Sequence, residues 1–368
     1  MAYYLGIMSG TSLDGVDVAL VDIKSNNDFA VIAAITLPFP PSLHVLLQRL
    51  IVKQHCDLKE FGTLDVALGQ FIAHAVDDLL SRQGISHNDI NAIGSHGHTV
   101  YHAPEDELPF SLQIGNPSVI AELSGITTVA DFRQRDIAAS GQGAPLVPAF
   151  HQALFSTPKQ TRLILNIGGI ANATLLEPKL AVIGFDTGPG NGLMDAWIER
   201  HLGQAYDRDG EWAASGQSSP ALLQQMLTDS YFSKAIPKST GREYFNLAWL
   251  QAQLNQFAQP IDIVDTQATL LSLTVTSITD AVKQYANNTQ GLYVCGGGVH
   301  NEQLMQLLGK ELPAVTVCST AELAIDPDSV EAAAFAWLAY RTVHQKSGNV
   351  PSVTGANRAV ILGGIYSA

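Results

Sequence analysis

The sequence has few cysteines, few charges and no long apolar run. Its three cysteines stand far apart among 368 residues, without a Cys-x-x-Cys pair. This spacing argues against a disulfide scaffold and favours a reducing compartment. No apolar run approaches the roughly 20 residues that span a bilayer, and the N-terminal segment lacks the basic region of a signal peptide. We therefore expect a cytoplasmic protein without a membrane segment.

Basic residues are scarce relative to acidic ones, with 20 Lys and Arg against 34 Asp and Glu and a net charge of −14. Such a field repels phosphodiester backbones and anionic lipid surfaces, so nucleic acid and membranes are not expected as partners. A small anionic ligand then requires a local cradle of backbone N–H groups, a cation, or both. At 46% hydrophobic and 15% charged residues, the composition is that of a folded protein with a sizeable core.

Two nucleotide-binding patterns are also missing. The sequence has no GxxxxGK[ST] loop, and no GxGxxG motif opens a helix after the first predicted strand. These absences disfavour a Walker-type ATPase and a standard dinucleotide enzyme. The 31 glycines that are present suggest tight turns and places where the backbone approaches a ligand closely.

The apolar pattern repeats one plan twice along the chain. The first series has predicted strands at 3–8, 16–23, 29–37 and 92–95 and helices at 42–53 and 58–83. The second has strands at 162–166, 171–176, 181–185 and 291–295 and helices at 191–202, 266–287, 300–309 and 330–344. Residues 203–220 and 345–356 are polar and are predicted to be loops. Because a domain usually has about 100–200 residues, we expect two similar α/β domains.

Three glycine-rich turns stand directly at strand ends, at 9–15, 167–170 and 296–298. Backbone N–H groups in such turns can point at one spot, and ligands of open α/β sheets bind beyond the carboxyl ends of strands. Any one of them is adequately explained as an ordinary tight turn. Three together favour a nucleotide cleft, in which hairpins from both domains hold a polyphosphate.

Asp186 stands where the predicted strand 181–185 meets a Gly/Pro turn and then a helix. A carboxylate at this position is well placed for chemistry. The same spacing equally permits a helix cap that accepts hydrogen bonds from the first N–H groups of the helix. Spacing alone leaves both interpretations open.

The turns belong to a longer set of stretches that resembles the anhydro-N-acetylmuramic acid kinase family. The set covers most of the chain, between residues 5 and 366, in the family's order. Its stretches are 6–17, 94–97, 131–133, 136–139, 141–146, 165–172, 185–191, 238–243, 295–298, 331 with 334–336, and 353–356. Each is short, but their number and order make the set specific.

The resemblance implies two ribonuclease-H-like domains of the actin-like ATPase superfamily around a nucleotide cleft. We place the N-terminal domain at 1–131 plus 345–368 and the C-terminal domain at 132–344. The implied reaction converts 1,6-anhydro-N-acetylmuramic acid, water and ATP to N-acetylmuramic acid 6-phosphate and ADP, a step in peptidoglycan recycling. ATP and Mg²⁺ are the implied cofactors, and a homodimer is implied as well.

The same match assigns roles to individual residues and makes Asp186 the general base. The implied ATP-binding residues are Gly10, Thr11, Ser12, Leu13, Asp14, Gly15, Val16, Asp17, Asn166, Gly168, Gly169, Gly296, Gly297 and Gly298. The implied substrate-binding residues are His96, Arg133, Gly188, Asn191 and Glu331.

Several polar residues keep a second interpretation. His96, His98 and His102 form an HxHxxxH cluster that invites a zinc site, but no cysteine lies near, and loop or sugar hydrogen bonding is preferred. His98 replaces a glutamine of the family. Arg133 is either a solvated loop charge or a fork for the lactyl carboxylate of muramic sugars. Glu331 is either an exposed first-turn acid or a substrate contact.

Asp14 and Asp17 flank the first hairpin, either as turn residues or as groups that hold the metal-bound phosphates or the reacting water. The wider superfamily commonly has an aspartate where this sequence has Met8, so phosphates and water are expected to hold much of the Mg²⁺.

Two other functions compete with the implied one. The first is a kinase for an ordinary N-acetylhexosamine, which a test of sugars with ATP would distinguish. The second is a nucleotide-driven switch of the actin or chaperone type. The absence of an added peptide-binding domain and the presence of a base in the 185–191 motif favour an enzyme.

Overall fold

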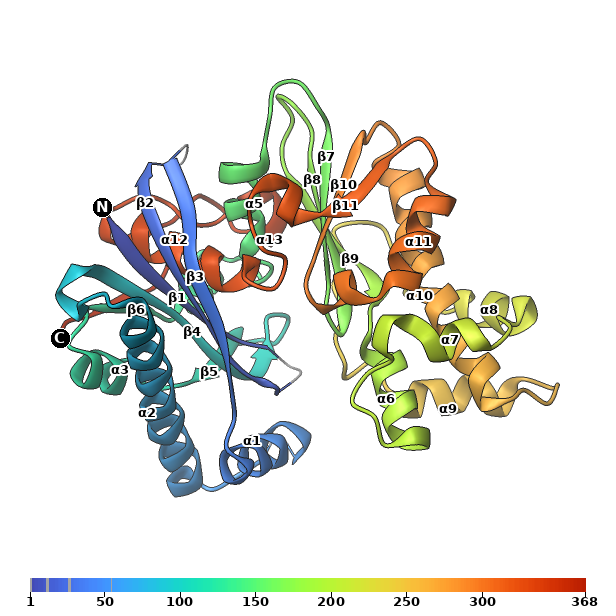
Figure 1. Cartoon of the computed structure of the whole chain (residues 1–368), viewed down its shortest axis with the longest axis horizontal. Helices are drawn as coiled ribbons and strands as arrows, with labels where there is room; N and C mark the ends of the chain where they lie inside the picture. Colours follow the sequence, from blue (N-terminus) through green and yellow to red (C-terminus); the bar gives the residue numbers. More distant parts are fainter. Residues whose placement is uncertain (1, 11–12, 26–27, 54) are drawn as a thin grey trace. The chain divides into compact units, whose positions relative to one another are not determined.

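The computed structural model describes residues 2–10, 13–25, 28–53 and 55–368. The chain divides into two compact units, each built around its own sheet (Figure 1). The first unit comprises Met1–Leu154 and Ser329–Ala368, and the second comprises Phe155–Asp328.

The first unit contains a mixed sheet with the strand order β12-β6-β4-β1-β2-β3, and β5 pairs with β4. Antiparallel pairing joins β1 to β2 and β2 to β3, whereas β1, β4 and β6 run parallel. The strands are β1 (Tyr3–Ser9), β2 (Gly15–Ser25), β3 (Asp28–Pro38), β4 (Ile90–Ala103), β5 (Phe110–Ile114), β6 (Thr128–Ala130) and β12 (Gly364–Tyr366).

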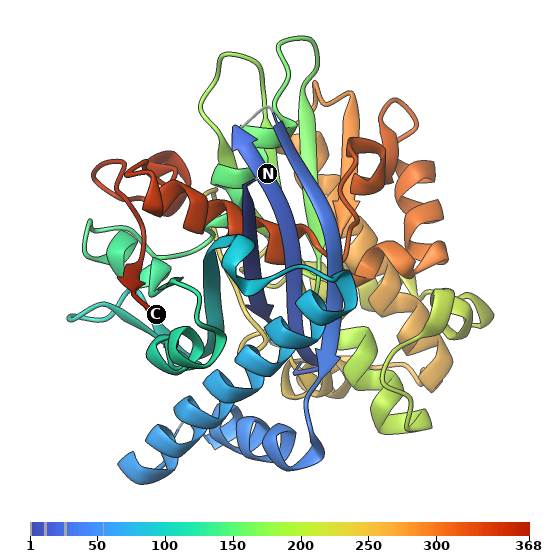
Figure 2. The ribbon, with the colours of Figure 1, turned by 60° about the vertical axis from the view of Figure 1, so that its left-hand side comes forward.

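Two helices cover opposite faces of this sheet (Figure 2). The helix α2 (Leu58–Gln83) packs its apolar side on the face that carries Leu5 and Ile7. On the other face, α12 (Val330–Val343) lies directly on the backbone of paired Gly6 and Gly94. A Cβ on either glycine would come within 2.0 Å of a carbonyl oxygen of α12. These glycines are therefore required by the close approach of the helix.

The remaining helices of the first unit are shorter. They are α1 (Pro41–Lys53), α3 (Pro117–Ser124), α4 (Phe132–Ile137), α5 (Val147–Phe155) and α13 (Pro351–Thr354).

The compact units differ from the predicted domain boundaries at both crossings of the chain. Residues 132–154 and 329–344, predicted for the C-terminal domain, belong to the first unit. The reason is packing: α12 lies on β1 and β4, and the buried Asp136 of α4 accepts hydrogen bonds from Asn349 and Thr354 at 2.7 and 2.9 Å. Apolar periodicity predicted these helices but carried no information about which sheet they cover.

The second unit has a five-stranded sheet with the order β11-β10-β7-β8-β9. Again an antiparallel meander, β7-β8-β9, is extended by parallel strands β10 and β11. The strands are β7 (Arg162–Ile167), β8 (Ile170–Leu176), β9 (Ile183–Pro189), β10 (Gly291–Cys295) and β11 (Thr316–Ser319).

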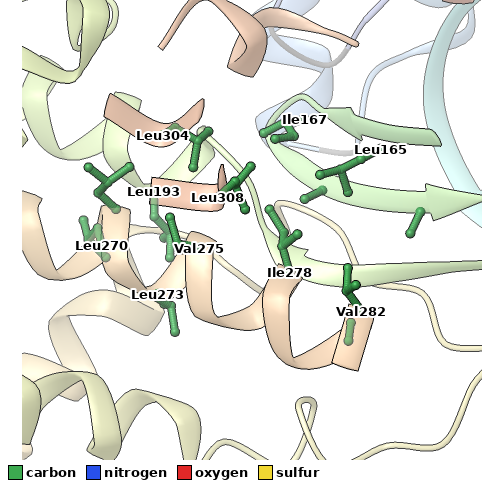
Figure 3. Packing of buried hydrophobic residues seen from close by; sticks show 14 of the residues in the cluster. Leu165, Ile167, Leu193, Leu270, Leu273, Val275, Ile278, Val282, Leu304 and Leu308 are labelled. Atoms are coloured by element: carbon green, nitrogen blue, oxygen red, sulfur yellow. The ribbon is translucent and has the colours of Figure 1, made fainter. Parts of the chain in front are cut away.

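Alternate residues of β7 place the core of the second unit on one face of its sheet. Leu165 and Ile167 face apolar side chains of the helices, among them Ile278 of α10 and Leu308 of α11 (Figure 3). The helices of this unit are α6 (Gly192–Leu202), α7 (Glu211–Ser215), α8 (Pro220–Leu227), α9 (Leu247–Gln256), α10 (Ile263–Tyr285) and α11 (Glu302–Glu311).

The predicted fold class is confirmed, because both units share one strand plan, a meander extended by parallel strands at its first strand. The predicted strand at 92–95 is much longer in the structure, Ile90–Ala103, because a bulge at Gly97 (φ 67°) lets β4 continue and pair with β5. Among the described residues, no helix has the length and apolar character needed to cross a membrane.

Candidate active site

The first glycine turn joins β1 to β2 in the first unit. Ser9 ends β1 and Gly15 begins β2, and the N–H of Leu13 donates to the carbonyl of Gly10 at 3.2 Å. The predicted ligands Thr11 and Ser12 lie outside the described residues. Leu13 has a φ of 61°, so the turn is sharply bent at a residue other than glycine.

The predicted nucleotide residues of this hairpin do not all offer side chains. Leu13 and Val16 are buried in the core of the first unit, so their side chains are not available to a ligand. Asp14 is exposed at the end of the turn. The Asp17 carboxylate accepts a hydrogen bond from the Thr36 hydroxyl at 2.6 Å, which ties β2 to β3 beside the turn.

The second glycine turn, Gly168 and Gly169, joins β7 to β8 and is held by backbone hydrogen bonds. The N–H of Asn191 donates to the carbonyl of Gly168 at 2.8 Å. The N–H groups of Gly190 and Gly192 donate to the carbonyl of Gly169 at 3.0 and 3.1 Å. The residues at the start of α6 therefore fix this turn mainly through backbone groups, and Asn191 Nδ2 adds a bond to the carbonyl of Ile167 at 3.4 Å.

The third turn, Gly296 to Gly298, follows β10 and packs against the end of β7. A Cβ on Gly296 would come within 2.3 Å of Asn166 Oδ1, and one on Gly298 within 2.4 Å of Ile167. The structure thus brings the predicted residues Asn166, Gly168, Gly169, Asn191 and 296–298 to the same end of one sheet.

The glycines of this sheet end fall into two groups. The one at 169 is packed, since a Cβ there would come within 2.4 Å of Arg242 Nε. At Gly168 the nearest atom to an added Cβ is 3.8 Å away, and at Gly297 it is 3.9 Å away. The packing of the second unit therefore does not require glycine at 168 or 297, where an added Cβ would make only ordinary van der Waals contact.

Asp186 lies within β9, the edge strand of the second sheet, and is half-buried. The N–H of Thr240 donates to its Oδ2 at 2.9 Å. Its backbone N–H donates to the carbonyl of Lys238 at 2.9 Å, and its carbonyl accepts from the Tyr231 hydroxyl at 2.8 Å. The loop after α8 therefore covers the free edge of β9 and fixes the carboxylate.

The helix-cap interpretation of Asp186 is wrong. The helix α6 begins at Gly192 with Asn191 at its N-cap. The Asp186 carboxylate accepts its hydrogen bond from the loop that covers β9, not from the helix. Burial raises the pKa of Asp186 from 3.8 to about 7, with a further rise from Glu243, against the opposing effects of the Thr240 N–H and Lys238. A carboxylate in this range exchanges protons near neutral pH.

Sequence analysis matched residues 238–243 to the family but assigned them no role in the site. Lys238 Nζ donates to the carbonyls of Tyr231 and Phe232 at 3.2 Å and lies 4.6 Å from the centre of the Tyr231 ring. Asp186 raises the pKa of Lys238, although burial lowers it overall. A conspicuous Lys-Ser-Thr-Gly-Arg-Glu run was the only signal in the sequence, and its distance from residue 186 hid the contact.

In the first unit, the predicted substrate residues His96, Arg133 and Glu331 lie together. Arg133 Nε donates to His96 Nε2 at 2.9 Å, and Arg133 Nη1 donates to the carbonyl of Gly143 at 2.9 Å. Because arginine cannot accept, His96 Nε2 is unprotonated, and Nδ1 carries the proton that bonds the Gly97 carbonyl at 3.0 Å. His96 therefore orients Arg133 and has both ring nitrogens engaged.

The pKa shifts of Arg133 and His96 agree with this hydrogen-bond arrangement. Burial lowers the pKa of Arg133 to about 10, and Glu331, in the first turn of α12, counteracts that shift. Burial and the neighbouring Arg133 also hold the pKa of His96 well below its ordinary value, so the ring is neutral. The guanidinium is thus a fixed, half-buried cation.

Asp136 is a second residue that sequence analysis did not single out. It is fully buried, and its carboxylate accepts from the Gly143 N–H at 2.9 Å, from Asn349 Nδ2 at 2.7 Å and from Thr354 Oγ1 at 2.9 Å. It therefore joins the matched stretches 136–139, 141–146 and 353–356 and holds the Gly143 carbonyl that binds Arg133.

The three histidines of β4 have three different partners. His98 bonds Ser9 at 3.0 Å, His102 bonds Ser111 at 2.9 Å, and His96 bonds Arg133. Among the described residues, no group of three or more His, Cys, Asp or Glu is arranged to hold a metal ion.

Two α/β units of one strand plan, each with glycine turns at a sheet end, have the fold of ribonuclease-H-like (actin-like ATPase) domains. A family model described as "Anhydro-N-acetylmuramic acid kinase" matches residues 2–368. The chain is 51% identical over 365 residues to the anhydro-N-acetylmuramic acid kinase of Shewanella loihica, covering 99% of this chain and 98% of the relative. It is 48% identical to that of Aliivibrio fischeri over 369 residues, with 100% of both chains covered. The chain belongs to the anhydro-N-acetylmuramic acid kinase family.

Similarity to solved structures of other proteins is more distant. Component A of the (R)-2-hydroxyglutaryl-CoA dehydratase of Acidaminococcus fermentans matches with a TM-score of 0.49 at 12% identity, covering 94% of this chain and 100% of that one.

Proposed function

We propose that this protein is an ATP-dependent kinase that opens 1,6-anhydro-N-acetylmuramic acid hydrolytically and phosphorylates its O6. The products are N-acetylmuramic acid 6-phosphate and ADP, and the process served is peptidoglycan recycling. Besides the family, one observation carries the proposal: the Asp186 carboxylate is held at a sheet edge by the Thr240 N–H, and its pKa is raised to about 7. A general base works best when its pKa lies near the operating pH.

The chemistry requires such a base. In the anhydro sugar, O6 is bonded to C1. Water attacks C1 and loses a proton to Asp186, the C1–O6 bond breaks, and O6 takes the γ-phosphoryl group from ATP, which leaves as ADP. Atoms and charges balance, because the water supplies the new hydroxyl at C1. Direct displacement inverts C1, so the first product is the α-anomer.

We propose that the glycine turns of both units bind the ATP. Backbone N–H groups of glycine turns can bind phosphates. The N–H of Gly168 already donates to the carbonyl of Ile170 at 3.2 Å, so other N–H groups of these turns would bind them. Neither Gly168 nor Gly297 is closely packed, which would allow a phosphate or base to approach. Mg²⁺ usually binds through one or two carboxylates, phosphate oxygens and water. The exposed Asp14 fits that requirement as a carboxylate beside the first turn. Mg²⁺ would neutralise the charge of the transferring phosphoryl group.

We propose that Arg133 binds the lactyl carboxylate of the sugar, with His96 as the group that orients it and Glu331 as a further substrate contact. Among the described residues, Arg133 uses Nε and one hydrogen of Nη1 for protein hydrogen bonds, which leaves Nη2 and the second hydrogen of Nη1 for a ligand. Guanidinium and carboxylate pair with two parallel hydrogen bonds. Gly188 and Asn191, near Asp186, complete the proposed substrate set.

We further propose that the protein is cytoplasmic and forms a homodimer, as sequence similarity to the family suggests. Its acidic composition suits a partner set of small molecules.

A phosphoryl-transfer assay tests the function. The full chain is incubated with Mg²⁺, ATP and anhydro-N-acetylmuramic acid, and the product is identified by mass and by anomeric NMR. The expected result is a 6-phosphate with one solvent oxygen at C1, first as the α-anomer. Product only from free N-acetylglucosamine would indicate an ordinary hexosamine kinase, and no sugar-dependent ADP release would contradict a sugar kinase altogether.

A further inference from the structure

Buried hydrogen bonds from two side chains connect the two ends of the first glycine hairpin. The Ser9 hydroxyl, at the end of β1, donates to the carbonyl of Gly15, at the start of β2, at 3.1 Å. His98 Nδ1 lies 3.0 Å from the same Ser9 oxygen. Ser9 is 2% exposed and His98 is 0% exposed, so water does not compete for these bonds. Ser9 thus connects the two ends of the hairpin, and His98 on β4 supports Ser9.

Counting protons fixes the direction of these bonds. The Ser9 hydroxyl has one hydrogen, and the Gly15 carbonyl can only accept, so that hydrogen goes to Gly15. His98 Nδ1 must therefore carry a proton and donate to Ser9. Burial lowers the pKa of His98 to about 4, which keeps the ring neutral with this single proton. The order of donation is His98 to Ser9 to Gly15.

A backbone irregularity places His98 at the hairpin. In the pairing of β1 with β4, Ile7 is opposite Ser95 but Ser9 is opposite His98, so β4 contains one extra residue. In a regular strand, residues three apart point to opposite faces, whereas here 95 and 98 pair with residues of one face. Gly97 makes the bulge possible with a φ of 67°, at a point where a Cβ would come within 2.3 Å of the Ile114 carbonyl.

We propose that His98 is a positioning residue for ATP. Through Ser9 it fixes Ser9 and Gly15, the two ends of the hairpin that is proposed to bind the phosphates. This inference rests on the proposed function of that hairpin. In this proposal His98 does not contact ATP itself but acts through Ser9 and Gly15.

Paired substitutions test the brace. His98→Leu places an apolar side chain of similar size at this buried position and removes the hydrogen-bond donor. Ser9→Ala removes a single oxygen, and His98→Asn replaces Nδ1–H with an amide N–H at a similar position. Because a lost hydrogen bond costs on the order of 1 kcal/mol, we expect KM and Kd for ATP to rise about 5–10-fold in His98→Leu and Ser9→Ala. KM for the sugar should stay within about twofold, and His98→Asn should recover most of the ATP affinity.

Two controls separate positioning from general damage. Ser111→Ala removes the matching imidazole–hydroxyl bond to His102 on the same strand and should leave ATP affinity unchanged. In the double variant Ser9→Ala with His98→Asn, the recovery should vanish, because the acceptor of the asparagine is gone. If His98→Leu does not fold, Ser9→Ala and the double variant still decide the question.

Three outcomes would overturn the inference. They are unchanged ATP affinity in a folded His98→Leu or Ser9→Ala protein, an equal rise in KM for both substrates, and failure of His98→Asn to recover affinity while Ser9→Ala loses it. Affinity for ATP is measured by calorimetry as well as by turnover. A wild-type protein that binds ATP without phosphorylating the sugar would contradict the proposed function, and ATP calorimetry on the variants would still test the brace.

Discussion

The two units share one strand plan but stabilise their first glycine turns differently. In the second unit, the turn at Gly168 and Gly169 is short, and three backbone N–H groups at the start of α6 hold its carbonyls. In the first unit the turn spans five residues between Ser9 and Gly15, and a buried histidine and serine close its neck. A longer loop has more conformations to lose, which is a physical reason for a buried side-chain brace at the longer turn, whereas backbone contacts supply most of the bonds at the shorter one.

The units also differ in the charged groups that they hold at their sheets. The second unit fixes a carboxylate, Asp186, on its edge strand β9, whereas the corresponding strand of the first unit, β3, ends in Leu37 and Pro38. The first unit instead fixes a cation, Arg133, through a neutral histidine on β4. The shared plan therefore fixes a carboxylate on the edge strand of one unit and a cation beside β4 in the other.

The largest expected difference between the two units concerns the proposed general base, Asp186. If only the second unit supplies it, Asp186→Asn should lower kcat at least about a hundredfold, since general base catalysis typically contributes about 10²–10⁴-fold. The asparagine oxygen can still accept from the Thr240 N–H, so the fold and ATP binding should persist. Steady-state kinetics and ATP calorimetry measure the two effects.

The control for this substitution is Asp209→Asn, which removes the same charge from an exposed position in the same unit. It should leave kcat unchanged. Near-normal turnover by a folded Asp186→Asn protein would remove Asp186 from the role of base.

The first unit's cation gives the next largest effect. We expect Arg133→Met to raise KM for the muramic sugar about 10–100-fold, because a bidentate charged pair contributes roughly 1.5–3 kcal/mol. A sugar that lacks the lactyl carboxylate should be affected much less. Arg135→Met, an exposed arginine of the same helix α4, is the matched control. An equal loss with both sugars would show that Arg133 does not read the carboxylate.

Local patterns predicted much of this architecture. The first hairpins and the long helices depend on neighbouring residues, and the predicted helix at 266–287 is observed at Ile263–Tyr285. Predictions were poorer where distant contacts decide the outcome. Residues 96–103 extend β4 only because Gly97 bulges and β5 pairs with them, and α12 joins the first unit because Gly6 and Gly94 allow it to sit on the sheet.

The site shows the same division. Sequence analysis found Asp186 and the glycines at strand ends, because motifs are local. The bond from the Thr240 N–H, 54 residues away, and the burial that raises the pKa of Asp186 are tertiary facts. The His98 brace was hidden for a related reason, since it depends on a strand register that no local pattern encodes.

A smaller effect tests the open glycines of the second unit. Gly168→Ala and Gly297→Ala add a methyl group that makes only ordinary van der Waals contact, so stability should change by less than about 0.5 kcal/mol. If phosphates or base approach there, KM for ATP should rise about tenfold, as for the loss of about 1.4 kcal/mol. Gly309→Ala, on α11 with no atom within 4 Å, is the control and should leave KM unchanged. Unchanged ATP affinity in both variants would exclude close approach at these turns.

The smallest effect concerns stability, where buried histidines of the first unit and Asp186 of the second should respond to pH with opposite sign. In the first unit, burial lowers the pKa of His98 and His102 to about 4 and of His151 to about 3, so the unfolded chain binds more protons and stability is lost as pH falls below about 6.5. Asp186 has a raised pKa of about 7, so the folded chain binds more protons than the unfolded one, and its contribution to stability is lost as pH rises from about 4 to 7. Asparagine does not titrate, so the Asp186→Asn variant does not lose this stability as the pH rises.

At pH 8 the Tm of Asp186→Asn should therefore exceed that of the wild type by a few degrees, on the order expected for a buried charge. The excess should shrink toward pH 5. The histidines are common to both proteins and cancel in this difference, and Asp209→Asn should show no such trend. A Tm difference that does not vary with pH would mean that the carboxylate is not held in an environment that disfavours its charge.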